Sequence, residues 1–260
     1  MDQGNGFGRQ VATELDDTLL SPGADGDRVR VLAHRGSPAP GRPENSAAAV
    51  TEALLQGADG VEIDVRLTPD GTLVCSHDPI DLLDAAGRAS IATLAEVLAA
   101  AQRFSGTRVV VEAKPVAGYD LALRTAHALA EVLRTAAGSA AITVSSFDPV
   151  LLAAIRAACA DLPVRTALLG DKTDAVEDVV RRAAEGGHDE VHLPLVGVRR
   201  IPQVVERAHS LGMAVALWTV NRRPALQWVA ELGIDAVITD DVLTAWSELD
   251  RAVLPELLAA

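Results

Sequence analysis

Two apolar segments, GVEIDV and VVVEAK, carry closely spaced charged residues. Glu62 and Asp64 stand two positions apart, and because side chains alternate between the two faces of a strand, both carboxylates are expected on one face. Glu112 and Lys114 repeat this spacing in the second segment. Adjacent buried carboxylates repel one another and are costly to desolvate unless a cation joins them. The pattern indicates either an oxygen-ligand site for Mg²⁺ or Ca²⁺ or a structural ion-pair cluster.

Histidines follow two further apolar runs. His34 and Arg35 end the run RVRVLAHR, directly before a loop that begins with Gly36 and contains three prolines, and His77 stands in SHDP. Imidazole titrates near neutral pH, so two histidines that meet at one site can act as a base and an acid. The other histidines are interpreted as structural, with His192 the one that could reach the same site. Together with Lys114 and the carboxylates, these residues suit a phosphoryl group held by a metal and by cations.

The elements that must position these residues form a regular alternation, which starts at Val29. Short β-branched runs are followed by Ala/Leu-rich stretches of helical period, for example 44–57, 89–102 and 121–138, as in βα units around a parallel sheet. Eight strands with helical returns predict an α/β fold, a (β/α)8 TIM barrel, whose site lies at the C-terminal ends of the strands. The predicted strands are 28–35, 60–65, 108–114, 141–147, 164–170, 190–195, 214–220 and 235–240.

One extended run, GTLVCSHD, does not belong to the eight strands. Only the turn TPDG separates it from the second strand, whereas a parallel crossover needs a dozen or more residues. The spacing therefore predicts a β-hairpin inserted after the second strand. Its returning strand is expected to carry His77 to the mouth of the barrel, where His34 and the carboxylates also end.

The composition of the 260-residue chain favours one large domain with an aliphatic core, since 49% of the residues are hydrophobic and only 3% aromatic. Residues 1–28 are rich in Gly and Asp and are interpreted as a flexible N-terminal extension, and residues 29–260 as the barrel domain. Of the 23 basic residues only Lys114 and Lys172 are lysines, so each invites a chemical explanation.

The charge and the cysteine count exclude several classes of partner. A net charge of −13 disfavours nucleic acid and anionic lipid surfaces. No apolar run approaches the ~18 residues of a membrane-spanning helix, so integral membrane association is not expected. Two cysteines are too few for a disulfide framework, and the first residues lack the features of a secretory signal. A cytoplasmic location is expected, and the sequence leaves open a monomer or a homo-oligomer.

A series of short motifs stands in order along the chain: HRG (34–36), PENS (43–46), GADGVEIDV (57–65), TPDG (68–71), SHDP (76–79), EAK (112–114), SSFDP (145–149), LWTVN (217–221) and GIDAVITDD (233–241). With these motifs the sequence resembles the glycerophosphodiester phosphodiesterase family of bacterial type. The resemblance extends from Val29 to Asp241. Two departures are a short segment after His77, without the Arg-Thr-Thr-Gly stretch of many relatives, and Asp241 where a proline is common.

The resemblance implies a role for each candidate residue. It makes His34 and His77 the catalytic acid–base pair. It makes Arg35 and Lys114 the contacts to the substrate phosphate. Glu44 is expected beside the metal or substrate, and Trp218 is expected to line the glycerol side of the pocket. The residues that it implies as ligands of Mg²⁺ or Ca²⁺ are Glu62, Asp64 and Glu112.

The activity that the resemblance implies is metal-dependent hydrolysis of a small glycerophosphodiester to glycerol 3-phosphate and an alcohol. Two alternatives stay open. A lipid phosphodiesterase of the lysophospholipase D or sphingomyelinase D kind would need apolar loops at the mouth, whereas the loops here are polar. A catalytically silent ligand-binding barrel would be expected to lack one of the histidines or carboxylates. The sequence leaves open which alcohol is released.

Overall fold

The computed structural model describes residues 28–83, 87–88, 91–136 and 140–249. β-Branched residues fill its strands and Ala/Leu-rich stretches its helices, as their side-chain conformations favour. The strands are β1 (Arg30–His34), β2 (Gly60–Leu67), β3 (Leu73–Cys75), β4 (Arg108–Ala113), β5 (Ala141–Ser146), β6 (Val164–Leu169), β7 (Glu190–Pro194), β8 (Ala214–Trp218) and β9 (Ala236–Thr239). The helices are α1 (Ala47–Leu55), α3 (Leu94–Ala101), α4 (Tyr119–Thr135), α5 (Pro149–Ala158), α6 (Val176–Glu185), α7 (Leu195–Val198), α8 (Val204–Ser210), α9 (Arg223–Leu232) and α10 (Val242–Glu248), with a 3₁₀ turn at Ile80–Leu82.

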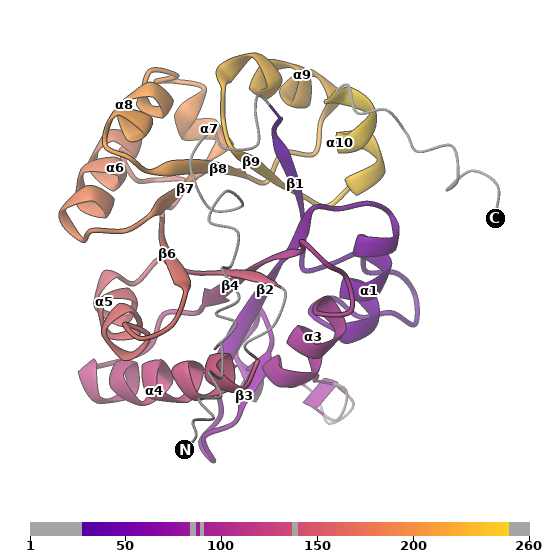
Figure 1. Ribbon diagram of the computed structural model, residues 1–260, viewed down its shortest axis with the longest axis vertical. Coiled ribbons are helices and arrows are strands. Elements are labelled where there is room, and N and C mark those ends of the chain that lie inside the picture. The colour runs from indigo at the N-terminus through magenta and orange to yellow at the C-terminus, as the bar shows by residue number, and fades with distance from the viewer. Residues whose placement is uncertain (1–27, 84–86, 89–90, 137–139, 250–260) are drawn as a thin grey trace, which may run out of the picture.

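Eight parallel strands close into a barrel in the order β1-β2-β4-β5-β6-β7-β8-β9. The barrel closes because β1 pairs with both β2 and β9. Figure 1 shows the strands as a ring with the helices around its outside. The predicted (β/α)8 TIM barrel is confirmed, and each of the eight strands lies within two residues of its expected ends. The C-terminal ends of all eight strands therefore meet at one mouth.

β2 runs on beyond the barrel and pairs antiparallel with the short strand β3. Val65 lies opposite Cys75, and Leu67 lies opposite Leu73. After β3 the chain stays against β2, because the N–H of Ser76 donates to the carbonyl of Asp64 at 3.1 Å. The next residue is His77, which this pairing holds at the C-terminal end of the barrel.

The alternation of side chains along β2 divides its residues between two environments. Val61, Ile63 and Val65 are buried in the large apolar core between the strands and the helices. Glu62 and Asp64 point the other way, into the barrel, as their spacing predicts. A smaller apolar cluster fills the barrel interior, and its members are Leu32, Val110, Ala216, Ala236 and Ile238.

A buried ion cluster fills the interior towards the N-terminal ends of the strands. The carboxylate of Glu190 pairs with Arg108, accepts a hydrogen bond from Thr143 Oγ1 at 3.0 Å, and lies 3.1 Å from Arg165 Nε. Its second oxygen lies 3.1 Å from His192 Nε2. Burial acts to raise the pKa of Glu190, but Arg108, His192 and Arg165 outweigh it and hold this pKa far below the usual range. The carboxylate is therefore ionised and fully paired.

Glu190→Gln is expected to lower the free energy of unfolding by about 3–5 kcal/mol, because it leaves the buried Arg108 and the partly buried Arg165 without their anion. Urea denaturation measures this loss. The matched control is Glu185→Gln, which breaks an exposed pair with Arg181 (3.0 Å) and should cost less than about 1 kcal/mol. A loss for Glu190→Gln no larger than that of the control would contradict a stabilising role for the cluster.

Part of the sequence-based predictions falls outside the described residues. These parts are residues 1–27 of the predicted N-terminal extension, residues 89–90 of the helix predicted at 89–102, and residues 137–138 of the helix predicted at 121–138. In the ranges that are described, no helix is long and apolar enough to cross a membrane. Cys75 and Cys159 are both buried and free.

Candidate active site

A pocket of about 360 Å³ opens at the C-terminal mouth of the barrel. Most of the predicted site residues line it, although they come from widely separated parts of the chain. The lining residues are His34, Arg35, Glu62, His77, Glu112, Lys114, Ser145, Phe147, Leu169, Lys172, His192, Trp218, Thr219 and Ile238. The strand ends thus bring both predicted acid–base histidines and two of the predicted metal ligands into one space.

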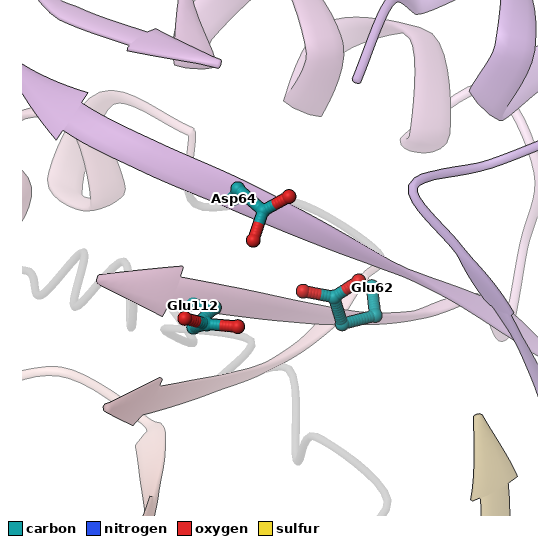
Figure 2. A group of neighbouring side chains, drawn as sticks. All are labelled: Glu62, Asp64 and Glu112. Atoms are coloured by element: carbon teal, nitrogen blue, oxygen red, sulfur yellow. The ribbon is translucent and has the colours of Figure 1, made fainter. Parts of the chain in front are cut away.

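Three buried carboxylates converge at the wall of this pocket. Glu62 and Asp64 extend from β2 and Glu112 from β4, and one oxygen of each lies within 4.8 Å of the others. Figure 2 shows the three groups turned towards the same space. The pairing of β2 with β4 produces this arrangement, because it sets Asp64 directly beside Glu112. The three carboxylates form a donor set of the kind that hard divalent cations prefer.

The charges of the three carboxylates are unequally compensated. Lys114 Nζ lies 2.6 Å from Asp64 Oδ1 and 2.6 Å from Glu112 Oε1, so its ammonium joins two of them. Burial acts to raise the pKa of Asp64, but Lys114, Asn45 and Arg35 together outweigh it and lower this pKa. Burial raises the pKa of Glu112, and Lys114 offsets the rise only in part.

Glu62 is the least compensated of the three. Burial, followed by repulsion from Asp64 and Glu112, raises its pKa well above the usual range. Its Oε1 atom is buried and has no hydrogen-bond partner among the described residues. A buried carboxylate oxygen without a partner is costly, so this atom indicates a place for a further cation.

Asn45, in the motif PENS, fixes the position of Asp64. Its Nδ2 donates to Asp64 Oδ2 at 2.9 Å, and its Oδ1 accepts the backbone N–H of Asp64 at 2.9 Å. The next residue, Ser46, caps helix α1 by accepting the N–H of Ala49 at 3.1 Å. The motif therefore anchors the loop after β1 both to a helix and to one of the three carboxylates.

His34, at the end of β1, is oriented by a residue from the other end of the chain. Its Nδ1 lies 2.6 Å from Asp240 Oδ1, just after β9, and Asn221 Nδ2 donates to Asp240 Oδ2 at 2.5 Å. The hydrogen bond with His34 is the main reason that the pKa of Asp240 lies below its ordinary value. An ionised Asp240 accepts the Nδ1 proton, so Nε2 is left as the free base. This Nε2 lies 3.9 Å from Glu62 Oε2.

The backbone of the HRG motif turns sharply beneath the site. Arg35 has φ 58° and Gly36 φ 80°, both in the left-handed region. A Cβ atom at Gly36 would lie 2.6 Å from the carbonyl carbon of Ala49, so glycine alone fits there. The left-handed Arg35 costs about 1–3 kcal/mol, and two hydrogen bonds hold it: its N–H donates to the Glu62 carbonyl at 2.8 Å, and its carbonyl accepts the Asn45 N–H at 3.0 Å.

This turn aims the Arg35 guanidinium at two carboxylates. Its Nε lies 3.2 Å from Asp64 Oδ2, and its Nη1 donates to Glu44 Oε1 at 3.0 Å. Burial acts to lower the pKa of Arg35, but Asp64 and Glu44 raise it overall. Glu44, predicted beside the metal or substrate, contacts Arg35 from the exposed side and is not among the residues that line the pocket.

The remaining predicted site residues, His77 and Trp218, both line the pocket. His77 Nδ1 lies 2.9 Å from Asp78 Oδ1, and the His77 carbonyl accepts a hydrogen bond from Arg66 Nη2 at 2.8 Å. Trp218, at the end of β8, meets Phe147 edge to face, with ring centroids 5.8 Å apart and an interplanar angle of 85°. The pocket thus has a charged side at β1, β2 and β4 and an aromatic side at Phe147 and Trp218.

Sequence reasoning gave no role to several residues that the structure brings to the site. Asp240 and Asn45 act on His34 and Asp64, and both stand in motifs, TDD and PENS, whose polar ends were visible in the sequence. His192, the one other histidine that the sequence left able to reach the site, lines the pocket while its Nε2 contacts Glu190. Ser145, inside β5, and Lys172, after β6, also line the pocket, and the sequence analysis gave neither residue a role in the site.

The fold and this site together define a TIM-barrel hydrolase of phosphate diesters, and comparisons with known proteins identify its family. The glycerophosphoryl diester phosphodiesterase family matches residues 34–111 and 84–244. A Mycobacterium tuberculosis protein named "Probable glycerophosphodiester phosphodiesterase 1" is 31% identical, over 85% of this chain and 93% of its own length. The chain belongs to the glycerophosphoryl diester phosphodiesterase family and is an enzyme of that class.

Solved structures agree with this assignment. A glycerophosphodiester phosphodiesterase from Thermotoga maritima is 27% identical with a TM-score of 0.65, and the match covers 83% of this chain and 96% of the other. A phosphodiesterase from Oleispira antarctica, solved in complex with the product sn-glycerol-3-phosphate, has a TM-score of 0.72 at 24% identity. That match covers 86% of this chain and 97% of the other, and it shows the shared fold.

Proposed function

We propose that the protein hydrolyses glycerophosphodiesters to glycerol 3-phosphate and an alcohol, with a divalent cation and an acid–base pair of His34 and His77. The observation that carries the proposal is that one pocket gathers both histidines, Glu62 and Glu112, and the cationic groups of Arg35 and Lys114. The product that the Oleispira antarctica relative binds, sn-glycerol-3-phosphate, is the expected product here.

The residues that would hold the cation are Glu62, Asp64 and Glu112. Their donor set fits Mg²⁺ or Ca²⁺, because it consists of three carboxylates whose oxygens lie within 4.8 Å and because Glu62 Oε1 has no hydrogen-bond partner in the described ranges. Bound there, either ion would supply a Lewis acid that polarises the phosphoryl oxygens. The same charge would offset the burial of Glu62 and its repulsion by Asp64 and Glu112, which together raise the pKa of this carboxyl.

The two histidines divide the proton transfers. Asp240 holds the Nδ1 proton of His34, so Nε2 accepts a proton from the attacking hydroxyl, which belongs to water or to the glycerol part of the substrate. His77, held at Nδ1 by Asp78, donates a proton to the oxygen of the leaving alcohol. Each histidine thus has an aspartate behind it that fixes its ring orientation, as in other paired acid–base sites.

Arg35 and Lys114 compensate negative charge on the substrate and take no part in the proton transfers. Burial acts to lower the pKa of Lys114, but Glu112 and Asp64 raise it overall, so the ammonium stays charged. Both cations lie at the pocket wall, where they offset the negative charge that builds on the phosphoryl oxygens in the transition state. Asp64 and Glu44 keep the guanidinium of Arg35 in place.

The proposal predicts glycerol 3-phosphate release from water-soluble diesters in the presence of Mg²⁺ or Ca²⁺, and none in EDTA. The panel consists of glycerophosphocholine, glycerophosphoethanolamine, glycerophosphoglycerol and glycerophosphoinositol, with lysophosphatidylcholine as the lipid substrate. Release from any soluble member, coupled to glycerol-3-phosphate dehydrogenase, supports the proposal and ranks the alcohols. Turnover of the lipid alone would instead make the protein a lysophospholipase D. No turnover with metal bound would indicate a silent binding barrel.

A further inference from the structure

The aromatic side of the pocket carries a positive charge. Lys172 Nζ lies 5.7 Å from the centroid of the Trp218 ring, at a distance where a cation is attracted to an indole face. Lys172 follows β6, which lies across the barrel from β1 in Figure 1, so this charge is remote from the strand that carries His34. Both lysines of the chain, Lys114 and Lys172, therefore line this one pocket.

The carboxylate next to Lys172, that of Asp171, makes its side-chain hydrogen bonds with Thr173 and forms no ion pair with the ammonium. The adjacent Asp171 turns its carboxylate to Thr173, accepting its backbone N–H at 2.9 Å and its hydroxyl at 2.7 Å. In the part of the chain that the structure describes, no carboxylate lies within 4.0 Å of the Lys172 ammonium, although Asp171 attracts its charge, and the ammonium lies over the ring of Trp218. A lysine ammonium is a compact, strongly hydrated point charge, so it makes this part of the wall polar.

Two buried polar atoms lie on side chains of the same pocket. Trp218 Nε1 and Ser145 Oγ are buried, and neither has a hydrogen-bond partner among the described residues. Ser145 is 1% exposed, and both side chains line the pocket. Buried donors of this kind are normally satisfied, and a ligand with hydroxyl groups would satisfy them. The aromatic side of the pocket therefore combines a ring surface suited to carbon atoms with donors suited to hydroxyls.

We infer that Lys172, held over Trp218, makes the enzyme select glycerol with free hydroxyls and reject glycerol that carries an acyl chain. The inference rests on the proposed function and names the substrate class of that same pocket. A free glycerol arm places its carbons on the rings and offers its hydroxyl oxygens to Lys172 and to Trp218 Nε1. An acyl chain on that arm must cross the face of Trp218, where it meets the hydrated ammonium.

The experiment compares two substrates that differ only in the acyl chain: glycerophosphocholine and hexanoyl lysophosphatidylcholine, the latter below its micelle concentration. Their phosphate and leaving group are the same, so the ratio of their kcat/KM values reports on the glycerol arm alone. The wild type should prefer glycerophosphocholine. Lys172→Met keeps the length of the side chain and its contact with Trp218 but removes the charge. This variant should raise kcat/KM for the lysolipid, relative to that for glycerophosphocholine, about tenfold. A gain of this size is expected from burying roughly two methylene groups.

Two matched variants separate charge from packing. Lys172→Arg keeps a cation over Trp218 and should keep the wild-type ratio. Arg199→Met removes a cation that lies 5.7 Å from the ring of Trp228, outside the pocket, and should leave the ratio unchanged. An unchanged ratio in Lys172→Met would overturn the inference, as would an equal rise in Lys172→Arg or a wild type that prefers the lysolipid.

Calorimetric titration with hexanoyl lysophosphatidylcholine keeps the inference testable without turnover. Lys172→Met should bind this compound about tenfold more tightly than the wild type does, whether or not either protein hydrolyses it. Tighter binding without turnover of any diester would contradict the proposed function and uphold the selectivity of the pocket. Turnover of glycerophosphocholine by the wild type, with no tighter binding of the lysolipid by Lys172→Met, would support the proposed function and overturn the inference about Lys172.

Discussion

Alanine at His34 lowers kcat for a glycerophosphodiester by about 100- to 10,000-fold while the barrel stays folded. The variant removes the only ring nitrogen that Asp240 prepares as a base, since the 2.6 Å contact at Nδ1 leaves Nε2 free. His77→Ala should cause a loss of the same order, because it removes the proton for the leaving alcohol. Steady-state release of glycerol 3-phosphate measures both losses, and circular dichroism checks the fold.

The chain offers a matched control for this pair. His209 also pairs with an aspartate, since its Nε2 lies 2.8 Å from Asp235 Oδ2, but it ends α8 at the opposite end of the barrel. Its side chain is 34% exposed, against 24% for that of His34. His209→Ala should therefore keep full activity. Activity close to wild type in both His34→Ala and His77→Ala would contradict the acid–base assignment.

A substitution at Asp240 tests the role of His34 as the base with a smaller expected loss of activity. Asp240→Asn keeps the size of the side chain but removes the charge that fixes the tautomer of His34, so kcat should fall less than in His34→Ala. Steady-state release of glycerol 3-phosphate measures kcat for both variants. A kcat equal to that of the wild type in Asp240→Asn would indicate that Asp240 serves packing alone.

The sequence was most informative where one strand carries both members of a pair. The period of two along β2 was enough to place Glu62 and Asp64 together in the barrel, and the same rule placed Lys114 beside Glu112. These predictions required no knowledge of how the strands pair. They follow from local geometry that a strand imposes wherever it is buried.

Contacts between distant segments could not be predicted in this way. His34 and Asp240 are 206 residues apart, and they meet because β1 and β9 close the barrel, with Ala33 beside Thr239. The contact between Lys172 and Trp218 depends in turn on the loop after β6 and on the last residue of β8. Spacing along the chain carries no information about such pairs until the order and register of the strands are known.

Replacing Glu62 is expected to have opposite effects on the stability of the protein with and without metal. In EDTA, Glu62→Gln should stabilise the protein, because it removes a buried charge that Asp64 and Glu112 repel. The folded pKa of Glu62 is raised, so the folded state binds this proton more tightly than the unfolded state does. The wild type therefore loses stability as pH rises from the unfolded pKa, about 4.3, through the folded one, and the advantage of the variant grows over that range.

With metal the order reverses. Outer-shell partners alone contribute roughly 10- to 100-fold to metal affinity, so the loss of the Glu62 carboxylate should weaken the Kd for Mg²⁺ or Ca²⁺ by about 100-fold or more. At a concentration 100 times the wild-type Kd, the ion stabilises the wild type by about 2.7 kcal/mol, whereas a 100-fold weaker site gains only about 0.4 kcal/mol. Thermal melts across a metal titration, with the exposed Glu185→Gln as control, measure both effects. If metal stabilises Glu62→Gln as much as the wild type, the ion binds elsewhere. If the variant is less stable than the wild type in EDTA, the charge of Glu62 is compensated in the metal-free fold. A site that destabilises the empty barrel and stabilises the loaded one is what three converging carboxylates with one unpartnered oxygen should produce.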